Sequence, residues 1–235
     1  MPTRRLLYLS AYRLTAFRWE RGELLSEAHF EATEQGQQLF AAYLAQHATS
    51  LFSLLSNAPE EGFHIETLPF LRGAHRKAVI KRKLGQLFFN VSLTTSQSLG
   101  YERSRRKSEH VLLAALSGKE FHQPWLDALS SAQVALSGVY SLAFLGSILI
   151  EKLKIHDARC LLLSVQDQSL RQSYFENGKL HFSRLTALQD ASIASYPGVA
   201  MGKLASLCQR ELFRDTTPAA HAAAATTTAT AARSA

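Results

Sequence analysis

Cysteine is scarce in this sequence of 235 residues, and its placement indicates no metal or redox site. The two cysteines, Cys160 and Cys208, are far apart and match none of the short spacings that bind zinc or form a redox pair. The nine histidines also lack the paired arrangement of a zinc hydrolase. We therefore expect no metal and no cofactor, and we interpret Cys160 as a buried thiol in a reducing cytoplasm.

Nucleotide-binding and nucleophile motifs are missing as well. The segment from Gly198 to Lys203 is one residue shorter than a P-loop, and Leu204 stands where the metal-binding hydroxyl should be. No Gly-x-Ser-x-Gly motif is present. Ser104 and Lys107 have a Ser-x-x-Lys spacing, but they fall in a charged hairpin tip, where a solvated lysine stays protonated and is a poor base. The sequence thus predicts no catalytic residue.

One long stretch without charge, residues 128–150, approaches the length of about 20 residues that a helix needs to cross a bilayer. Serine and glutamine interrupt it six times, and Gly138 breaks it. We therefore predict a buried strand at Val134–Gly138 and a core helix at about Leu142–Leu153, with a membrane-inserted segment as the alternative. The N-terminal apolar run is interrupted by Arg13 and is too short for a secretory signal.

Positive charge is abundant, with a formal net charge of +7, and it concentrates in residues 72–83 and 103–107. Hydrophobic residues make up 46% of the chain, which is normal for a soluble protein with a core. A candidate interaction patch comprises Arg76, Lys77, Lys81, Arg82, Arg103, Arg105, Arg106 and Lys107. A solvated face, an acidic protein partner, and phosphates of nucleic acid or lipid head groups are the alternatives for this patch.

The stretch Leu161–Phe182 predicts two strands joined by a tight turn at Asn177-Gly178, a dipeptide that tolerates the positive φ angles of a two-residue hairpin. A similar pattern lies 156 residues earlier. There Leu162, Leu163, Leu170, Phe175, Glu176, Gly178 and Leu180 correspond to Leu6, Leu7, Leu14, Trp19, Glu20, Gly22 and Leu24. A repeat at this long spacing indicates two related half-domains.

Around the first copy, hydrophobic periodicity predicts three strands, a helix and a fourth strand, at Arg5–Ser10, Arg13–Trp19, Glu23–Phe30, Glu34–His47 and Leu51–Leu55. An insertion is expected at about 59–117, with a helix at 74–88 and strands at 94–101 and 110–116. Pro124 fits the first turn of a following helix.

This organisation resembles the actin-like ATPase superfamily, which is built from ribonuclease-H-like half-domains, and is most similar to the cytoplasmic actin-like proteins of type IV pilus and type II secretion assembly. The resemblance implies an α/β fold with a mixed sheet and flanking helices. It implies a complete first half at 1–158, including the insertion at about 59–117. We also expect a partial second half at 159–215, with a β-meander and a short helix at Lys203–Phe213. Residues 216–235, rich in Ala and Thr, are expected to be disordered.

In that superfamily the first turn of each half carries Asp-x-Gly, which meets the nucleotide phosphates and the metal. Here Tyr8-Leu9-Ser10 and Ser164-Val165-Gln166 stand at the matching positions, and Asp167 is the nearest acid in the second turn. The degenerate phosphate loops are therefore Tyr8, Ser10, Ser164, Gln166 and Asp167. Without carboxylates to hold Mg²⁺ against phosphates, phosphoryl transfer lacks its main electrostatic support, so we predict no ATP hydrolysis.

The sequence therefore predicts a non-catalytic actin-like scaffold. It would bind a protein partner in a bacterial pilus- or secretion-type assembly, in the cytoplasm at the inner face of the membrane. One alternative is an ATP-binding switch, in which Asp167 and backbone N–H groups replace the missing motif. The other is a nucleic-acid-binding module that uses Arg103, Arg105, Arg106 and Lys107.

Overall fold

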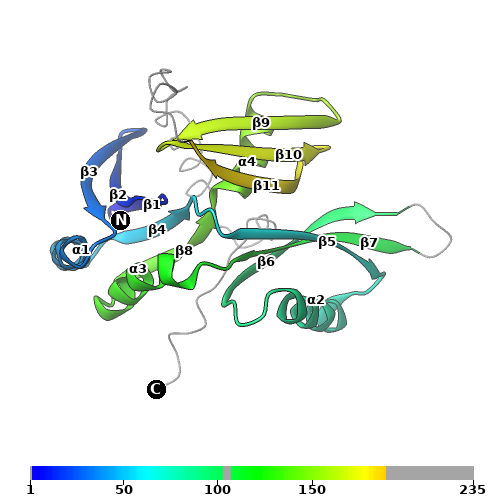
Figure 1. Cartoon of the computed structure of the whole chain (residues 1–235), viewed down its shortest axis with the longest axis horizontal. Helices are drawn as coiled ribbons and strands as arrows, with labels where there is room; N and C mark the ends of the chain where they lie inside the picture. The colour runs from blue at the N-terminus through cyan, green and yellow to red at the C-terminus, as the bar shows by residue number, and fades with distance from the viewer. Residues whose placement is uncertain (1, 103–106, 189–235) are drawn as a thin grey trace.

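The computed structural model describes residues 2–102 and 107–188. Their strands form three sheets, one of five strands and two of three (Figure 1). The expected short helix at Lys203–Phe213 and the Ala/Thr-rich tail lie outside the described residues.

The five-stranded sheet has the order β3-β2-β1-β4-β8. Its strands are β1 (Arg4–Leu9), β2 (Arg13–Glu20), β3 (Glu23–Glu31), β4 (Leu51–Ser56) and β8 (Ala135–Ser141). β1, β2 and β3 form an antiparallel meander, whereas β1, β4 and β8 run parallel. This is the strand arrangement expected for the first half.

Helices cover both faces of this sheet, which is why β1 is apolar at consecutive positions. Leu7 and Leu9 belong to the core under α1 (Glu34–Gln46) and α3 (Lys119–Ser131). Leu6 and Tyr8 point the other way and pack with Leu142 and Leu145 of α4 (Leu142–Lys152). The period of two along β1 therefore divides its side chains between two cores.

The insertion expected at about 59–117 contains a separate antiparallel sheet of order β5-β7-β6, with α2 (Gly73–Leu87) packed against it. Its strands are β5 (Glu61–Pro69), β6 (Leu93–Tyr101) and β7 (Ser108–Leu116). The helix and two of these strands match the expected ranges closely. β5 was not predicted, because the charged residues Glu61 and Glu66 interrupt the alternation of apolar and polar residues that marks a strand.

The uncharged stretch 128–150 divides between the end of α3, the strand β8 and the helix α4, so the predicted strand and core helix are confirmed. None of the described helices is both long and apolar enough to span a bilayer. The expectation for Pro124 is wrong: α3 begins at Lys119, and Pro124 lies inside the helix. A proline there donates no backbone hydrogen bond to the preceding turn.

The second meander forms the sheet β11-β10-β9, from β9 (Arg159–Gln166), β10 (Ser169–Glu176) and β11 (Lys179–Ala187). Its pairing reproduces that of β1–β3 after the shift of 156 residues. The pairs Leu9↔Leu14, Arg13↔Glu31 and Trp19↔Leu24 correspond to Val165↔Leu170, Ser169↔Ala187 and Phe175↔Leu180. Each copy also contains one register shift in its second hairpin. The predicted internal repeat is therefore confirmed.

The second meander packs on α4, next to which it lies in Figure 1. Phe175 and Leu180 are fully buried there against Ala143, Phe144 and Ile150. Gly146 permits the close approach, because a Cβ atom at this position would lie 2.5 Å from Cζ of Phe175. A glycine in the middle of α4 thus sets the distance between helix and meander.

We expect Gly146→Ala to destabilise the protein by about 1–3 kcal/mol, because the new methyl group overpacks the Phe175 contact. Alanine normally stabilises a helix interior relative to glycine by about 1 kcal/mol. Gly85→Ala in α2 is the matched control, since no atom lies within 4 Å of its added Cβ. Urea denaturation should show opposite signs for the two variants, and stabilisation by both would contradict the close packing of α4 on the meander.

Candidate functional site

The first turns of the two meanders face each other, although they are far apart in sequence. In the first, Ser10 N donates to the Arg13 carbonyl over 3.0 Å, and Ser10 Oγ accepts a hydrogen bond from Tyr12 N. In the second, Asp167 and Gln168 both have positive φ, 44° and 55°, as a two-residue type I′ hairpin requires. Neither turn contains glycine.

The structure changes the assignment of the predicted phosphate-loop residues. Tyr8, Ser164 and Gln166 lie in strands rather than in turns, so only Ser10 and Asp167 occupy the turns themselves. β1 ends at Leu9, the second of the three positions matched to Asp-x-Gly, and β9 ends at Gln166, the third. Ser164 lies beside α4 and lines a small cavity of about 20 Å³, away from the opposite turn.

Two side-chain contacts join the two meanders at and beside these turns. Tyr8 Oη donates a hydrogen bond to Gln166 Oε1 over 2.9 Å, and both residues are buried. Arg13 forms an ion pair with Asp167 at 3.2 Å, with its own side chain 42% exposed. The Asp167 carboxylate is therefore held by a cation from the other half, while its backbone carbonyl accepts a hydrogen bond from Ser169 Oγ in its own turn.

Arg171 of β10 extends this contact into a buried network. Its Nε donates to Asn57 Oδ1 over 2.7 Å, and one of its terminal nitrogens donates to the Ala58 carbonyl over 3.1 Å. The other terminal nitrogen lies 3.2 Å from Glu61 Oε2 and also donates to Ser183. These four partners belong to the chain after β4, to β5 and to β11, so one guanidinium ties the second meander to the first half.

Asn57 closes the chain of contacts, because its Nδ2 donates to Tyr8 Oη over 2.9 Å. Hydrogen bonds thus run without a break from Gln166 through Tyr8, Asn57 and Arg171 to Glu61. Asn57 is 1% exposed and Arg171 is 3% exposed. Side chains therefore fill the space between the paired turns.

Burial dominates the electrostatics of this network. It raises the pKa of Tyr8 well above its ordinary value, and the nearby Asp167 carboxylate adds to that shift, so Tyr8 stays a neutral donor. Burial also raises the pKa of Glu61, while the Arg171 guanidinium opposes the shift. The ion pair of Arg171 and Glu61 has side chains only 4% and 3% exposed. Such a pair is costly to break, because the remaining charge would have no compensation.

This arrangement offers little to a nucleotide. The two turns supply a hydroxyl, an amide and a single carboxylate, and Arg13 already neutralises that carboxylate. Within residues 2–102 and 107–188, no three His, Cys, Asp or Glu residues gather in a group that could hold a metal ion. A phosphate in this space would have to displace Tyr8, Asn57 or Arg171 from its partners.

The predicted basic patch is divided by the structure. Arg76 donates two hydrogen bonds of 2.8 Å to Glu109 and so anchors α2 to β7. Lys77 and Lys81 line a groove beside α2, which does not include Arg82, and Lys107 lies at the start of β7. Arg103, Arg105 and Arg106 lie outside the described residues.

Sequence reasoning missed the central members of the network, Asn57, Glu61 and Arg171. One signal was available for Arg171: it alternates with Ser169, Ser173 and Phe175, so a cation shares the face of β10 that the core covers. A charged residue on such a face needs a buried partner.

We expect Arg171→Met to destabilise the protein by about 3–5 kcal/mol, because Glu61 and Asn57 would lose their buried partner. Arg184→Met on β11 is the matched control, since Arg184 is exposed and its side chain donates to the nearby Thr186, and it should change stability by less than about 0.5 kcal/mol.

Adding Glu61→Leu to Arg171→Met should recover at least half of the loss, because no buried charge would then remain unpaired. Urea denaturation measures all these variants. An Arg171→Met variant as stable as the control would show that the two halves do not depend on this residue.

Comparison with known proteins gave matches among solved structures alone: no family model and no curated protein matched the sequence. The structure described as the PilM-PilN type IV pilus biogenesis complex is similar at a TM-score of 0.57 and 13% identity, over 87% of this chain and 68% of that chain. The cytoplasmic domain of EpsL, an inner membrane component of the type II secretion system of Vibrio cholerae, gave 0.45 and 11%, over 83% and 76%.

A Bacteroides thetaiotaomicron protein with an actin-like ATPase fold gave a TM-score of 0.44 and 10% identity, over 83% of this chain and 73% of that chain. At these identities the matches concern the fold. The match to the PilM-PilN structure, with its TM-score above 0.5, shows that this chain shares that fold, which within the described residues combines a five-stranded mixed sheet with a second, antiparallel meander.

Proposed function

We propose that this protein is a non-catalytic actin-like scaffold that binds a protein partner in a bacterial pilus- or secretion-type assembly. The observation that carries the proposal is the buried network from Gln166 to Glu61. It occupies the position where, by resemblance to the superfamily, acidic turns would meet a metal and phosphates. The side chains themselves hold the halves together, so their mutual orientation needs no nucleotide.

The partner class follows from the same fold. The similar PilM structure is described as a complex with a second protein, PilN, in type IV pilus biogenesis. A rigid body with no catalytic acids suits such an assembly, because it presents constant surfaces. We propose that the protein acts in the cytoplasm, at the inner face of the membrane.

A calorimetric and melting-temperature titration with Mg²⁺-ATP tests this proposal. A ligand at 100 times its Kd stabilises a protein by about 2.7 kcal/mol, so 1 mM nucleotide would reveal a Kd of about 10 μM. We expect neither heat of binding nor a shift in the melting temperature. A nucleotide-binding actin-like ATPase measured in the same buffer is the positive control.

Asp167→Ala decides between the scaffold and the ATP switch. If ATP raised the melting temperature of the parent by several degrees and this variant lost the effect, the switch would be correct and the scaffold proposal wrong. The scaffold proposal expects Asp167→Ala to remove only the partly exposed contact with Arg13, at a cost of about 1 kcal/mol or less.

A further inference from the structure

The helix α2 of the insertion carries positive charge along its whole length and contains no Asp or Glu. On its side toward the sheet this charge is neutralised. Arg76 lies 2.8 Å from a carboxylate oxygen of Glu109, and Lys83 makes the same kind of pair, 2.6 Å from Glu66. The cations that remain available on α2 are therefore those directed toward solvent.

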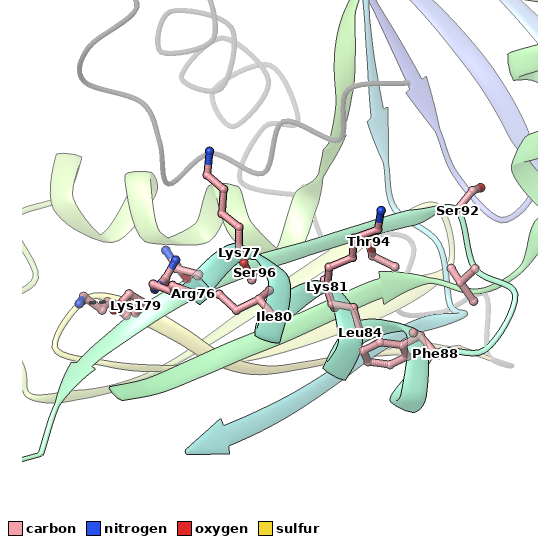
Figure 2. A pocket seen from close by; sticks show the side chains of 14 residues that line it. Arg76, Lys77, Ile80, Lys81, Leu84, Phe88, Ser92, Thr94, Ser96 and Lys179 are labelled. Carbon is pink, nitrogen blue, oxygen red and sulfur yellow. Dashed lines mark hydrogen bonds between the residues drawn. The ribbon is translucent and has the colours of Figure 1, made fainter. Parts of the chain in front are cut away.

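Three such cations, Lys77, Lys81 and Arg82, lie on the outer side of the helix. All three are exposed, and within residues 2–102 and 107–188 they form no ion pair. Figure 2 shows Lys77 and Lys81 projecting from α2 in the same direction. Since no acid of α2 offsets them, the outer side of the helix attracts an anionic ligand.

An exposed pair of aromatic rings lies at the N-terminal end of the same helix. Phe70 is 38% exposed and Tyr101 is 55% exposed, although phenylalanine is usually buried. Their ring centroids are 5.6 Å apart, and Arg72, which directly precedes α2, lies over the Phe70 ring at 4.9 Å. Tyr101 is opposite Glu109 in the sheet, and Glu109 binds Arg76, so Tyr101 lies on the face that α2 covers.

The charge around the aromatic pair is positive as well. Arg72 and Lys107 are exposed, and a hydrogen bond of 3.1 Å from Phe70 N to the Lys107 carbonyl brings the two segments together. Glu102 offsets one of these charges, and its carboxylate accepts a hydrogen bond from Ser108 Oγ over 2.8 Å. Exposed cations and exposed aromatic rings thus share one side of the insertion.

We propose that this side of the insertion, the outer side of α2 together with Phe70 and Tyr101, docks on an anionic membrane surface. Lys77, Lys81 and Arg82 pair with the lipid head groups, and the two rings enter the interface between head groups and acyl chains. The inference deepens the proposed function, on which it rests for a position at the inner face of the membrane. It names the contact that holds the protein there.

The geometry of the aromatic pair favours a lipid surface over nucleic acid. A base of a single strand needs a free ring face on which to stack. Arg72 already lies over the Phe70 ring, and Tyr101 meets the same ring at an interplanar angle of 64°. A ring at a membrane interface needs no free face, because its apolar body is buried among lipids rather than against one flat partner.

Cosedimentation of the full chain with vesicles tests this surface. One set of vesicles contains equal parts of phosphatidylcholine and phosphatidylglycerol, and the other contains phosphatidylcholine alone. We expect binding to the anionic vesicles only. Added salt should weaken it, because the Debye length falls from about 10 Å at 0.1 M to about 3 Å at 1 M. Equal binding to both kinds of vesicle, or to neither, would overturn the proposal.

Charge reversal on α2 separates this surface from the net charge of the protein. Lys77→Glu/Lys81→Glu should weaken binding at least tenfold, because each Lys near an anionic surface contributes about a fivefold factor in affinity. Lys119→Glu/Arg184→Glu is the matched control, since it changes the net charge equally at exposed positions of α3 and β11. The control should bind within about twofold of the parent. The same loss in both variants would refute docking through α2.

Removal of the two rings tests their part without a change of charge. Phe70→Ser/Tyr101→Ser should lose at least fivefold in affinity for the anionic vesicles, because less apolar surface enters the interface. Tyr12→Ser, which removes a 45% exposed ring from the first meander, is the matched control and should bind like the parent. Urea denaturation checks that the variants remain folded. Parent-like binding of the double variant would contradict insertion of the rings and hence the proposed docking mode.

A single-stranded oligonucleotide and free inorganic phosphate serve as competitors. We expect neither to release the protein from anionic vesicles at physiological salt. Tighter binding of the oligonucleotide, lost in Lys77→Glu/Lys81→Glu, would assign the surface to nucleic acid and overturn the proposal. Vesicle binding requires no nucleotide, so its failure leaves the ATP titration untouched, and the two proposals can fail separately.

Discussion

The buried guanidinium of Arg171 is the interaction on which the relation between the two halves depends. It is 3% exposed, and it reaches Asn57, Ala58, Glu61 and Ser183 at once. A planar fork with five donors suits such a position, because it can satisfy acceptors in several directions. Asn57 in turn donates a hydrogen bond to Tyr8, and Tyr8 donates one to Gln166. A buried charge of this kind specifies one docking geometry, since any other leaves it unpaired.

The internal repeat shows how one local pattern acquires two environments. In the first copy Leu7 is fully buried, because β1 has a neighbour on each side and helices over both faces. The corresponding Leu163 in the second copy is 56% exposed, because α4 packs on the face of this sheet that carries Cys160 and Leu162, and Leu163 points to the opposite face. The second meander is held instead by α4, which packs on one face of its sheet, and by the hydrogen-bond network at its first turn. Its rigidity therefore comes from tertiary contacts.

The contact between the two meanders has a buried part and an exposed part. Asn57 and Arg171 are shielded from solvent, whereas the ion pair of Arg13 and Asp167 has an arginine side chain that is 42% exposed. The buried part contributes most of the stability, because solvent screens a partly exposed ion pair.

The sequence alone determined the meanders and their relation, because alternation, the turns at Gly22 and Gly178, and apolar spacing are local signals. It also determined that both turns lack the acidic pair. Only the tertiary structure decided that Arg171 pairs with Glu61, 110 residues away, and that Arg76 pairs with Glu109. It also decided that charged β5 is a strand and that Pro124 lies within a helix. The partners of a buried charge are fixed by packing, which places residues together without leaving a periodic trace in the sequence.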